Sequence, residues 1–137
     1  MSKYIYVHAG DNNPVPDAEK INISNVNMIS NGSSENILCD CLDLFTISER
    51  TVLTNELLKK LRVGGTLHLK FINLKLFSKN CYLDRIEEKQ LNNIIANVKS
   101  LVDDSHLEQI LNNSTNFAIK SLVYDGLSEN VIIERRA

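Results

Sequence analysis

The chain has 137 residues and a mass of 15.5 kDa, enough for one hydrophobic core, so we expect a single domain over residues 1–137. Its formal net charge of −2 argues against a nucleic-acid partner, because domains that bind nucleic acids usually carry a basic excess. No apolar run reaches the roughly 18 residues that span a membrane, and the first residues lack the pattern of a signal peptide. These features favour a cytoplasmic location and argue against a membrane partner.

Cysteine spacing and asparagine content add two further expectations. Cys39 and Cys41 are separated by one residue, whereas structural zinc sites use cysteine pairs about two to four residues apart and four ligands in all. We therefore expect no metal site, and we expect reduced, partly buried thiols in an apolar strand instead. The 17 asparagines indicate a genome rich in A and T, which fits a virus acting in the host cytoplasm.

The first third of the chain predicts short strands joined by loops. The segment Lys3–Ala9 alternates between two faces, as a strand does, and Gly10 ends it. The Asx residues and two prolines of Asp11–Pro16 exclude a helix there. Further strands are expected at Lys20–Ser24 and Asn36–Leu42, and Val26–Ile29 is a candidate for another short strand.

The best-specified element is a helix that begins at Thr46. Thr46 and Glu49 have the spacing of a capping box, in which the two side chains bind the free backbone N–H groups of the first turn. Leucines at helical spacing behind them form one apolar stripe, and Gly64 is expected to end the helix in the left-handed conformation. The strand Thr66–Ile72 should follow.

Two more helices are predicted in the second half. Asp84 is expected to cap a helix whose apolar stripe runs from Leu91 to Val102. Ser105 and Glu108 have the spacing of a second capping box, which predicts the start of a shorter helix.

The end of the chain predicts a hairpin. The strands Phe117–Tyr124 and Asn130–Arg135 flank a turn at Asp125-Gly126. Alternating strands and helices followed by a hairpin predict an α/β fold with a mainly parallel sheet and a C-terminal antiparallel hairpin. Only ten residues, 10–19, separate the first two strands, so their connection should be an extended loop rather than a helix.

Four segments resemble the class I S-adenosylmethionine-dependent methyltransferases. His8–Ser24 is similar to the opening of a short subgroup, which has a glycine turn and a proline-containing loop in place of a long first helix. Leu57–Phe71, with its glycine pair, resembles the helix–turn–strand unit of the family, and Cys41–Phe45 and His106–Gly126 resemble the segments on either side of it. The resemblance implies a Rossmann-like sheet truncated in its first half, and S-adenosylmethionine as the cofactor.

The same resemblance implies which residues would bind the cofactor. Gly10 matches a loop glycine that lets the backbone approach the ligand, and Ser24 stands where the family has the acid that binds the ribose hydroxyls. Losing that acid should weaken binding by roughly one to two orders of magnitude. The full set of implied cofactor contacts is His8, Gly10, Asp11, Asn12, Ser24 and Asp43. No catalytic residue and no methyl acceptor is indicated.

Alternatives stay open for the individual side chains. His8 could act as a general base, or it could be a packing or solvent-facing residue at a strand end. Asp11 and Asp43 could flank a ligand cleft beyond the strand ends, or they could cap a turn and a helix.

The strand Thr66–Ile72 alternates where a strand covered on both faces would be continuously apolar. Its polar side chains, His68 and Lys70, should share one sheet face with Tyr4 and Tyr6. Such a face would be covered by a second copy or another protein, or it could be the solvent side of an ordinary edge strand.

Two functions remain open at this stage. The chain could be a minimal methyltransferase, since methyl transfer depends mainly on proximity and orientation and requires few side chains. It could also be a relative with a degenerate cofactor site that serves as a non-catalytic scaffold in a larger assembly, for example a viral particle.

Overall fold

The computed structural model describes residues 4–8, 18–111 and 115–137. The strands in this part of the chain are β1 (Tyr4–His8), β2 (Ala18–Asn22), β3 (Ser34–Cys39), β4 (Leu61–Ile72), β5 (Phe117–Asp125) and β6 (Ser128–Arg135). The helices are η1 (Ile23–Met28), η2 (Leu42–Leu44), α1 (Ile47–Lys60), α2 (Leu74–Tyr82), α3 (Glu88–Asn97) and α4 (Asp104–Leu111), where η denotes a 3-10 helix.

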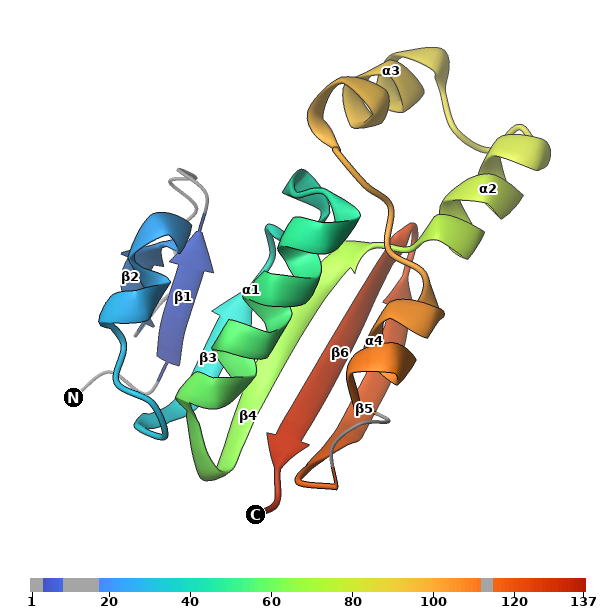
Figure 1. The fold of residues 1–137 in the computed structure, drawn as a ribbon. Helices are drawn as coiled ribbons and strands as arrows, with labels where there is room; N and C mark the ends of the chain where they lie inside the picture. Colours follow the sequence, from blue (N-terminus) through green and yellow to red (C-terminus); the bar gives the residue numbers. More distant parts are fainter. Residues whose placement is uncertain (1–3, 9–17, 112–114) are drawn as a thin grey trace.

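The strands form one sheet in the order β2-β1-β3-β4-β6-β5. The four strands β2, β1, β3 and β4 are parallel, and β6 is antiparallel to both of its neighbours (Figure 1). The predicted α/β fold with a mainly parallel sheet and a C-terminal hairpin is therefore confirmed. Within this hairpin β6 lies inside the sheet, next to β4, and β5 forms the edge.

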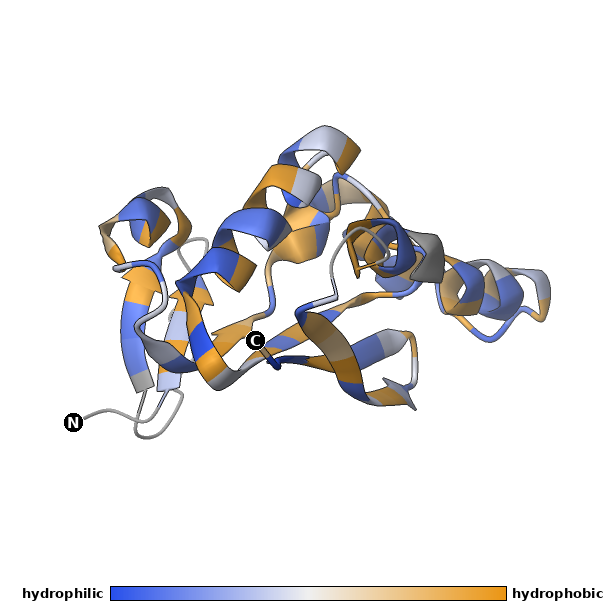
Figure 2. Ribbon diagram, turned by 60° about the horizontal axis from the view of Figure 1, so that its bottom comes forward, coloured by the Kyte–Doolittle hydropathy of each residue, from blue (hydrophilic) through white to orange (hydrophobic). Residues whose placement is uncertain are grey.

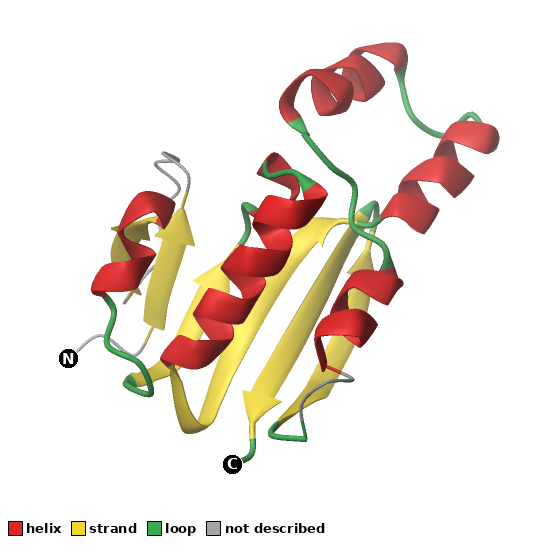
Figure 3. Cartoon of the chain, in the orientation of Figure 1, coloured by secondary structure: helices red, strands yellow, loops and turns green. Residues whose placement is uncertain are grey.

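The helices that pack on the sheet lie on one face. Figures 1 and 3 show η1, α1 and α4 in front of the strands, and the turned view of Figure 2 shows no described helix beneath them. Strand order explains this arrangement, because the connections from β2 to β3, β3 to β4 and β4 to β5 all advance in one direction along the sheet. Right-handed crossovers in one direction place their helices on the same face. The hairpin from β5 to β6 and the connection from β1 to β2 run the other way, and residues 9–17 of the latter lie outside the described part.

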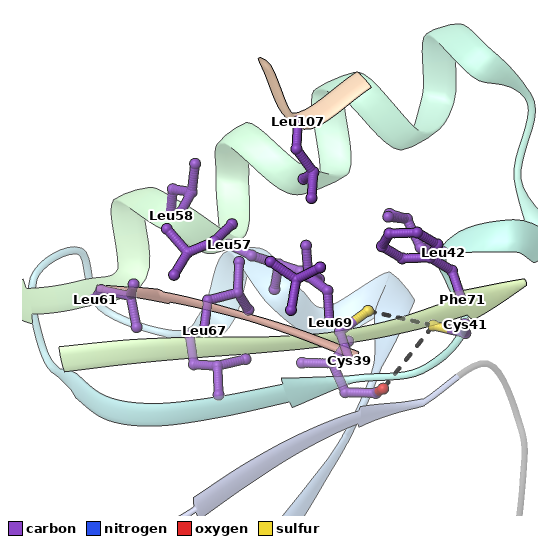
Figure 4. Packing of buried hydrophobic residues seen from close by; sticks show 14 of the residues in the cluster. Cys39, Cys41, Leu42, Leu57, Leu58, Leu61, Leu67, Leu69, Phe71 and Leu107 are labelled. Carbon is purple, nitrogen blue, oxygen red and sulfur yellow. Dashed lines mark hydrogen bonds between the residues drawn. The ribbon is translucent and has the colours of Figure 1, made fainter. Parts of the chain in front are cut away.

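The hydrophobic core fills the space between this helix layer and the sheet. Leu57 of α1 and Leu107 of α4 pack against Leu67, Leu69 and Phe71 of β4 (Figure 4). Burying a side chain of this size stabilises the fold by roughly 1.5–3 kcal/mol. The alternation of β4 puts its apolar side chains into the core and its polar ones on the opposite face.

The capping box at the start of α1 is confirmed. The hydroxyl of Thr46 accepts a hydrogen bond from the Glu49 amide at 3.3 Å, and the Glu49 carboxylate accepts one from the Thr46 amide at 3.2 Å.

The expectation that Gly64 ends this helix is wrong. The helix ends at Lys60, and Leu61 already has an extended backbone because its side chain is fully buried in the core. Gly64, at φ 83°, lies instead in an irregularity of β4, between the pairs Ser34–Leu61 and Asn36–Thr66.

Several other element boundaries also differ from the sequence predictions. The prediction of a short strand at Val26–Ile29 is wrong, because those residues belong to η1 and to the bend after it. The N-terminus of η1 is capped by Asn22. The strand expected at Asn36–Leu42 begins earlier, at Ser34, and ends at Cys39. Cys41 and Leu42 therefore lie beyond the sheet edge.

The helices after β4 are shorter and more numerous than predicted. Asp84 does not cap a helix: it has a left-handed φ of 54° after α2, and α3 starts only at Glu88. The helix α2 was missed altogether; its cap is Asn73, whose side-chain oxygen accepts a hydrogen bond from the Leu76 amide at 3.0 Å. Ser105 lies within α4 rather than before it. No helix in the described ranges is long and apolar enough to cross a membrane.

Candidate cofactor site

Polar side chains gather where the parallel strands end. The carboxyl ends of β1, β2, β3 and β4 meet at one edge of the sheet, the edge at which open α/β sheets bind their ligands. His8 ends β1, Asn22 ends β2, Asp43 lies in η2 after β3, and Asn73 follows β4. The predicted contacts Gly10, Asp11 and Asn12 lie outside the described residues.

Asp43 is bound to the protein's own backbone. Its side chain is almost completely buried, and one carboxylate oxygen accepts a hydrogen bond from the Ile72 amide at 3.1 Å. Its carbonyl oxygen accepts two more, from the amides of Lys99 at 3.0 Å and Ser100 at 3.2 Å. Burial raises the pKa of the Asp43 carboxyl, and the charge of nearby Asp40 acts in the same direction, although the Ile72 hydrogen bond opposes them. Asp43 thus joins η2, β4 and the segment before α4.

Asn22, rather than Ser24, ends β2. The prediction that Ser24 occupies the strand end is wrong, since the chain has already turned into η1 at Ile23. The side-chain oxygen of Asn22 accepts hydrogen bonds from the Ser24 amide at 3.1 Å and the Ser24 hydroxyl at 2.9 Å. The position where the resemblance puts a ribose-binding acid therefore holds a neutral amide, whose oxygen caps the helix.

A tyrosine–carboxylate pair occupies the same edge. The Tyr6 hydroxyl donates to Asp40, lying 3.0 and 2.9 Å from its two carboxylate oxygens, and the Tyr6 ring centroid is 5.9 Å from that of His8. Tyr6 is fully buried, so the expectation that it is available to a partner is wrong. Asp40 was missed by the sequence analysis, although an acidic residue directly after a central strand is itself a usable signal.

A second missed pair closes the end of β4. The Asn73 amide nitrogen donates to a carboxylate oxygen of Glu129 at 2.8 Å, and both side chains are buried. Because Asn73 also caps α2, this pair fixes the start of α2 to β6.

The helix layer contains a groove next to this edge. A cavity of about 480 Å³ lies between η1 and α1, a size within the range of ligand pockets. Its walls are mainly apolar, with Phe45, Val52 and Leu53 on the α1 side and Ser24 and Val26 on the η1 side. The cavity could accept a flat apolar group. The Glu49 carboxylate lines the cavity near the sheet edge, but it is already bonded to the Thr46 amide in the capping box.

The cysteines are free thiols. Cys39 and Cys41 are buried in the core with their sulfurs 3.8 Å apart, but only Cys39 lies in a strand, and Cys81 is exposed on α2. Hydrogen bonding to Cys39 and burial together raise the pKa of the Cys41 thiol, so it stays protonated. Among the described residues no group of three His, Cys, Asp or Glu side chains could hold a metal ion.

The architecture, in contrast to the sequence, has close counterparts among known proteins. No family model and no curated protein matches the chain. An O-methyltransferase family protein from Burkholderia thailandensis superposes over 98% of the chain with a TM-score of 0.64 and 12% identity. A SAM-dependent methyltransferase from Anabaena variabilis superposes over 91% with a TM-score of 0.58 and 14% identity. The chain has the fold of S-adenosylmethionine-dependent methyltransferases.

The chain covers only part of the length of these structures. The chain spans 43% of the Burkholderia protein, 61% of the Anabaena protein and 59% of a plantazolicin methyltransferase in complex with SAH, with which its TM-score is 0.61. The TM-scores of 0.58–0.64 establish a shared fold, whereas identities of 12–14% establish no shared activity.

The described residues do not fit the adenosyl group. Asn22 lacks the negative charge that would bind two ribose hydroxyls, and its oxygen is already used. The Asp43 side chain is almost completely buried, and one of its two carboxylate oxygens is bonded to the Ile72 amide of β4. The groove beside η1 is mainly apolar, and three of its polar side chains, those of Ser24, Glu49 and Glu56, are already bonded within the protein, to Asn22, Thr46 and Lys59.

Proposed function

We propose that the chain is a methyltransferase-like protein whose cofactor site is degenerate and does not support methyl transfer. One observation carries the proposal: two side chains at the edge where a cofactor would bind, Asn22 and Asp43, accept hydrogen bonds from the protein's own backbone. In this proposal the chain keeps the methyltransferase fold, but the polar side chains at the carboxyl ends of the strands stabilise that fold instead of binding a cofactor.

The energies at Asn22 favour this proposal. A hydrogen bond to a charged acceptor contributes about 1.5–3 kcal/mol, and about half of that is lost when the acceptor is neutral. Releasing Asn22 from its cap would cost a further 1 kcal/mol or so. A total of about 1.8–2.5 kcal/mol corresponds to a loss of affinity of roughly 20- to 60-fold.

The energies at Asp43 act in the same direction. The Asp43 side chain is almost completely buried and one carboxylate oxygen already accepts a hydrogen bond from the Ile72 amide, so a contact with the sulfonium of adenosylmethionine would compete with that bond.

Titration calorimetry with S-adenosylmethionine and S-adenosylhomocysteine tests the proposal. We expect dissociation constants weaker than about 0.1 mM for both ligands. A tighter constant for either ligand would contradict it.

A charge-restoring variant sharpens this test. Asn22→Asp returns the carboxylate, and aspartate caps helices as well as asparagine does. We expect it to bind S-adenosylhomocysteine about tenfold more tightly than the unmodified chain. Asn25→Asp, which adds the same charge at an exposed position of η1, should have no effect.

A second candidate function is that of a non-catalytic scaffold in a larger assembly. It is favoured by the sheet face that no described helix covers, since an uncovered face of this kind is a surface for protein contacts.

A further inference from the structure

The face of the sheet opposite the helix layer, here called the open face, is defined by the alternation of the strands. Leu67, Leu69 and Phe71 of β4 enter the core, so the residues between them point the other way. The side chains of the open face that matter below are Tyr4, Leu38, His68, Lys70, Ile132 and Glu134.

The centre of the open face is a row of half-buried side chains. Leu38 of β3 pairs with His68 of β4, which in turn pairs with Ile132 of β6, so the three lie side by side across the sheet. The Tyr4 ring extends the row and meets the His68 ring edge to face, with centroids 6.4 Å apart. Interfaces have centres of this composition, with apolar and aromatic side chains and few charges.

Opposite charges lie on the two sides of this row. Lys70 is two residues beyond His68 toward the carboxyl end of β4, and Glu134 is two residues beyond Ile132 in the other direction. Lys70 makes no ion pair with any described residue. The ion pairs of Glu134, with Lys120 at 3.8 Å and Arg136 at 3.6 Å, are long and partly exposed, so they hold it weakly.

From this arrangement we infer that the open face is self-complementary and binds a second copy of the chain, sheet against sheet, about a two-fold axis. A two-fold axis that lies between the two sheets and passes near His68 and Ile132 places Lys70 of one copy opposite Glu134 of the other. Each lysine then meets the glutamate of the other copy, which gives two intermolecular ion pairs and an apolar centre. This reciprocal contact is what a two-fold dimer requires.

The geometry agrees with the known packing of sheets. Lys70 and Glu134 are separated by about 13 Å along the strands and by one strand spacing of about 4.8 Å across them. The two-fold rotation that brings each Lys70 opposite the Glu134 of the other copy makes the strands of the two sheets cross at about −40°. This angle is close to the roughly −30° at which aligned sheets pack.

The area is sufficient for a weak dimer. The strands β3, β4, β6 and β5 give the open face a width of about 19 Å, and the longer strands reach about 25 Å, so the footprint is on the order of 450–500 Å² per copy. The total of roughly 1,000 Å² is that of small, weak interfaces, so we expect a micromolar dimer.

Sedimentation equilibrium with charge-reversed variants tests the dimer. Wild-type chain should dimerise between about 5 and about 500 µM. Lys70→Glu and Glu134→Lys should each raise the dissociation constant at least tenfold, because each places like charges against each other twice. The double variant should restore dimerisation, since the swapped charges again meet across the axis.

The restoration is the decisive outcome. Within one chain Lys70 and Glu134 are not neighbours, since Glu134 pairs with Thr66, so a rescue can only come from contact between copies. Lys79→Glu, the same charge change on α2, should leave the dissociation constant unchanged, and circular dichroism should show that all variants remain folded. A chain that stays monomeric over this range, or a dimer whose loss in the single variants is not reversed in the double variant, would overturn the inference.

Discussion

Replacing Gly65 with alanine is expected to lower the free energy of unfolding by about 3 kcal/mol. A Cβ at this position would lie 2.7 Å from the Ser34 carbonyl oxygen, 2.9 Å from that of Arg62 and 3.1 Å from that of Glu35. All three are backbone atoms at the point where β3 and β4 meet, so no side-chain rotation can relieve the clash. Either the strands separate there, or the register of β4 shifts.

Gly64→Ala is the matched comparison. Nothing lies within 4 Å of a Cβ at Gly64, so the only cost is the left-handed backbone, with φ at 83°. That cost is about 1–2 kcal/mol. Urea denaturation followed by circular dichroism should therefore show a loss for Gly65→Ala at least 1.5 times that for Gly64→Ala. Equal losses, or a larger loss at Gly64, would show that this account of the glycine pair is wrong.

The second large effect is a dependence of stability on pH that arises from His106. This side chain is 5% exposed, and its Nε2 has no hydrogen-bond partner among the described groups. Burial, together with the charge of Arg50, lowers its pKa to about 4. Arg50 is itself buried and donates to the Ser100 hydroxyl at 2.8 Å and to the Leu101 carbonyl oxygen at 2.9 Å, so it cannot move away.

The sign of the effect follows from the two pKa values. The folded-state pKa, about 4, is below the unfolded value of about 6.5. Between these values the unfolded chain takes up a proton that the folded chain does not, so falling pH favours unfolding. The stability present above about pH 6.5 should therefore fall by about 2–3 kcal/mol as the pH drops to about 4.

A variant isolates the His106 contribution. Other groups titrate in the same range, and Asp43, with its raised pKa, acts in the opposite direction, since its protonation is easier in the folded chain. His106→Phe removes the titrating group and keeps a ring of similar shape. The unfolding free energies of the wild type and the variant should run parallel above about pH 6.5 and converge or cross below it. Parallel curves down to pH 4 would contradict the account.

The sequence predicted the elements whose signals are local. The capping box of Thr46 and Glu49 and the turn at Asp125-Gly126 were both found correctly, because a few neighbouring side chains determine them. The end of α1 was wrong for the opposite reason. Its position depends on the burial of Leu61 against strands distant in sequence, which overrides the glycine three residues later.

The site was predicted less well than the fold. The strand-end position was placed two residues too late, at Ser24 instead of Asn22, because the apolar–polar alternation continues from Ile21 in β2 to Ile23 in η1 and hides the end of the strand. The pairs Tyr6–Asp40 and Asn73–Glu129 join residues 34 and 56 positions apart, and such contacts cannot be derived without the strand register. The open face was anticipated from His68 and Lys70, because alternation in a central strand is a local signal.

The central claim is that the carboxyl edge of this methyltransferase fold no longer holds an adenosyl ligand. Amide NMR spectra of the labelled chain, recorded during addition of S-adenosylhomocysteine to about 1 mM, observe that edge residue by residue. We predict no saturable shifts of the amides in Asn22–Met28 and Leu42–Phe45. Saturable shifts confined to these two segments, with a midpoint below about 0.1 mM, would contradict the claim.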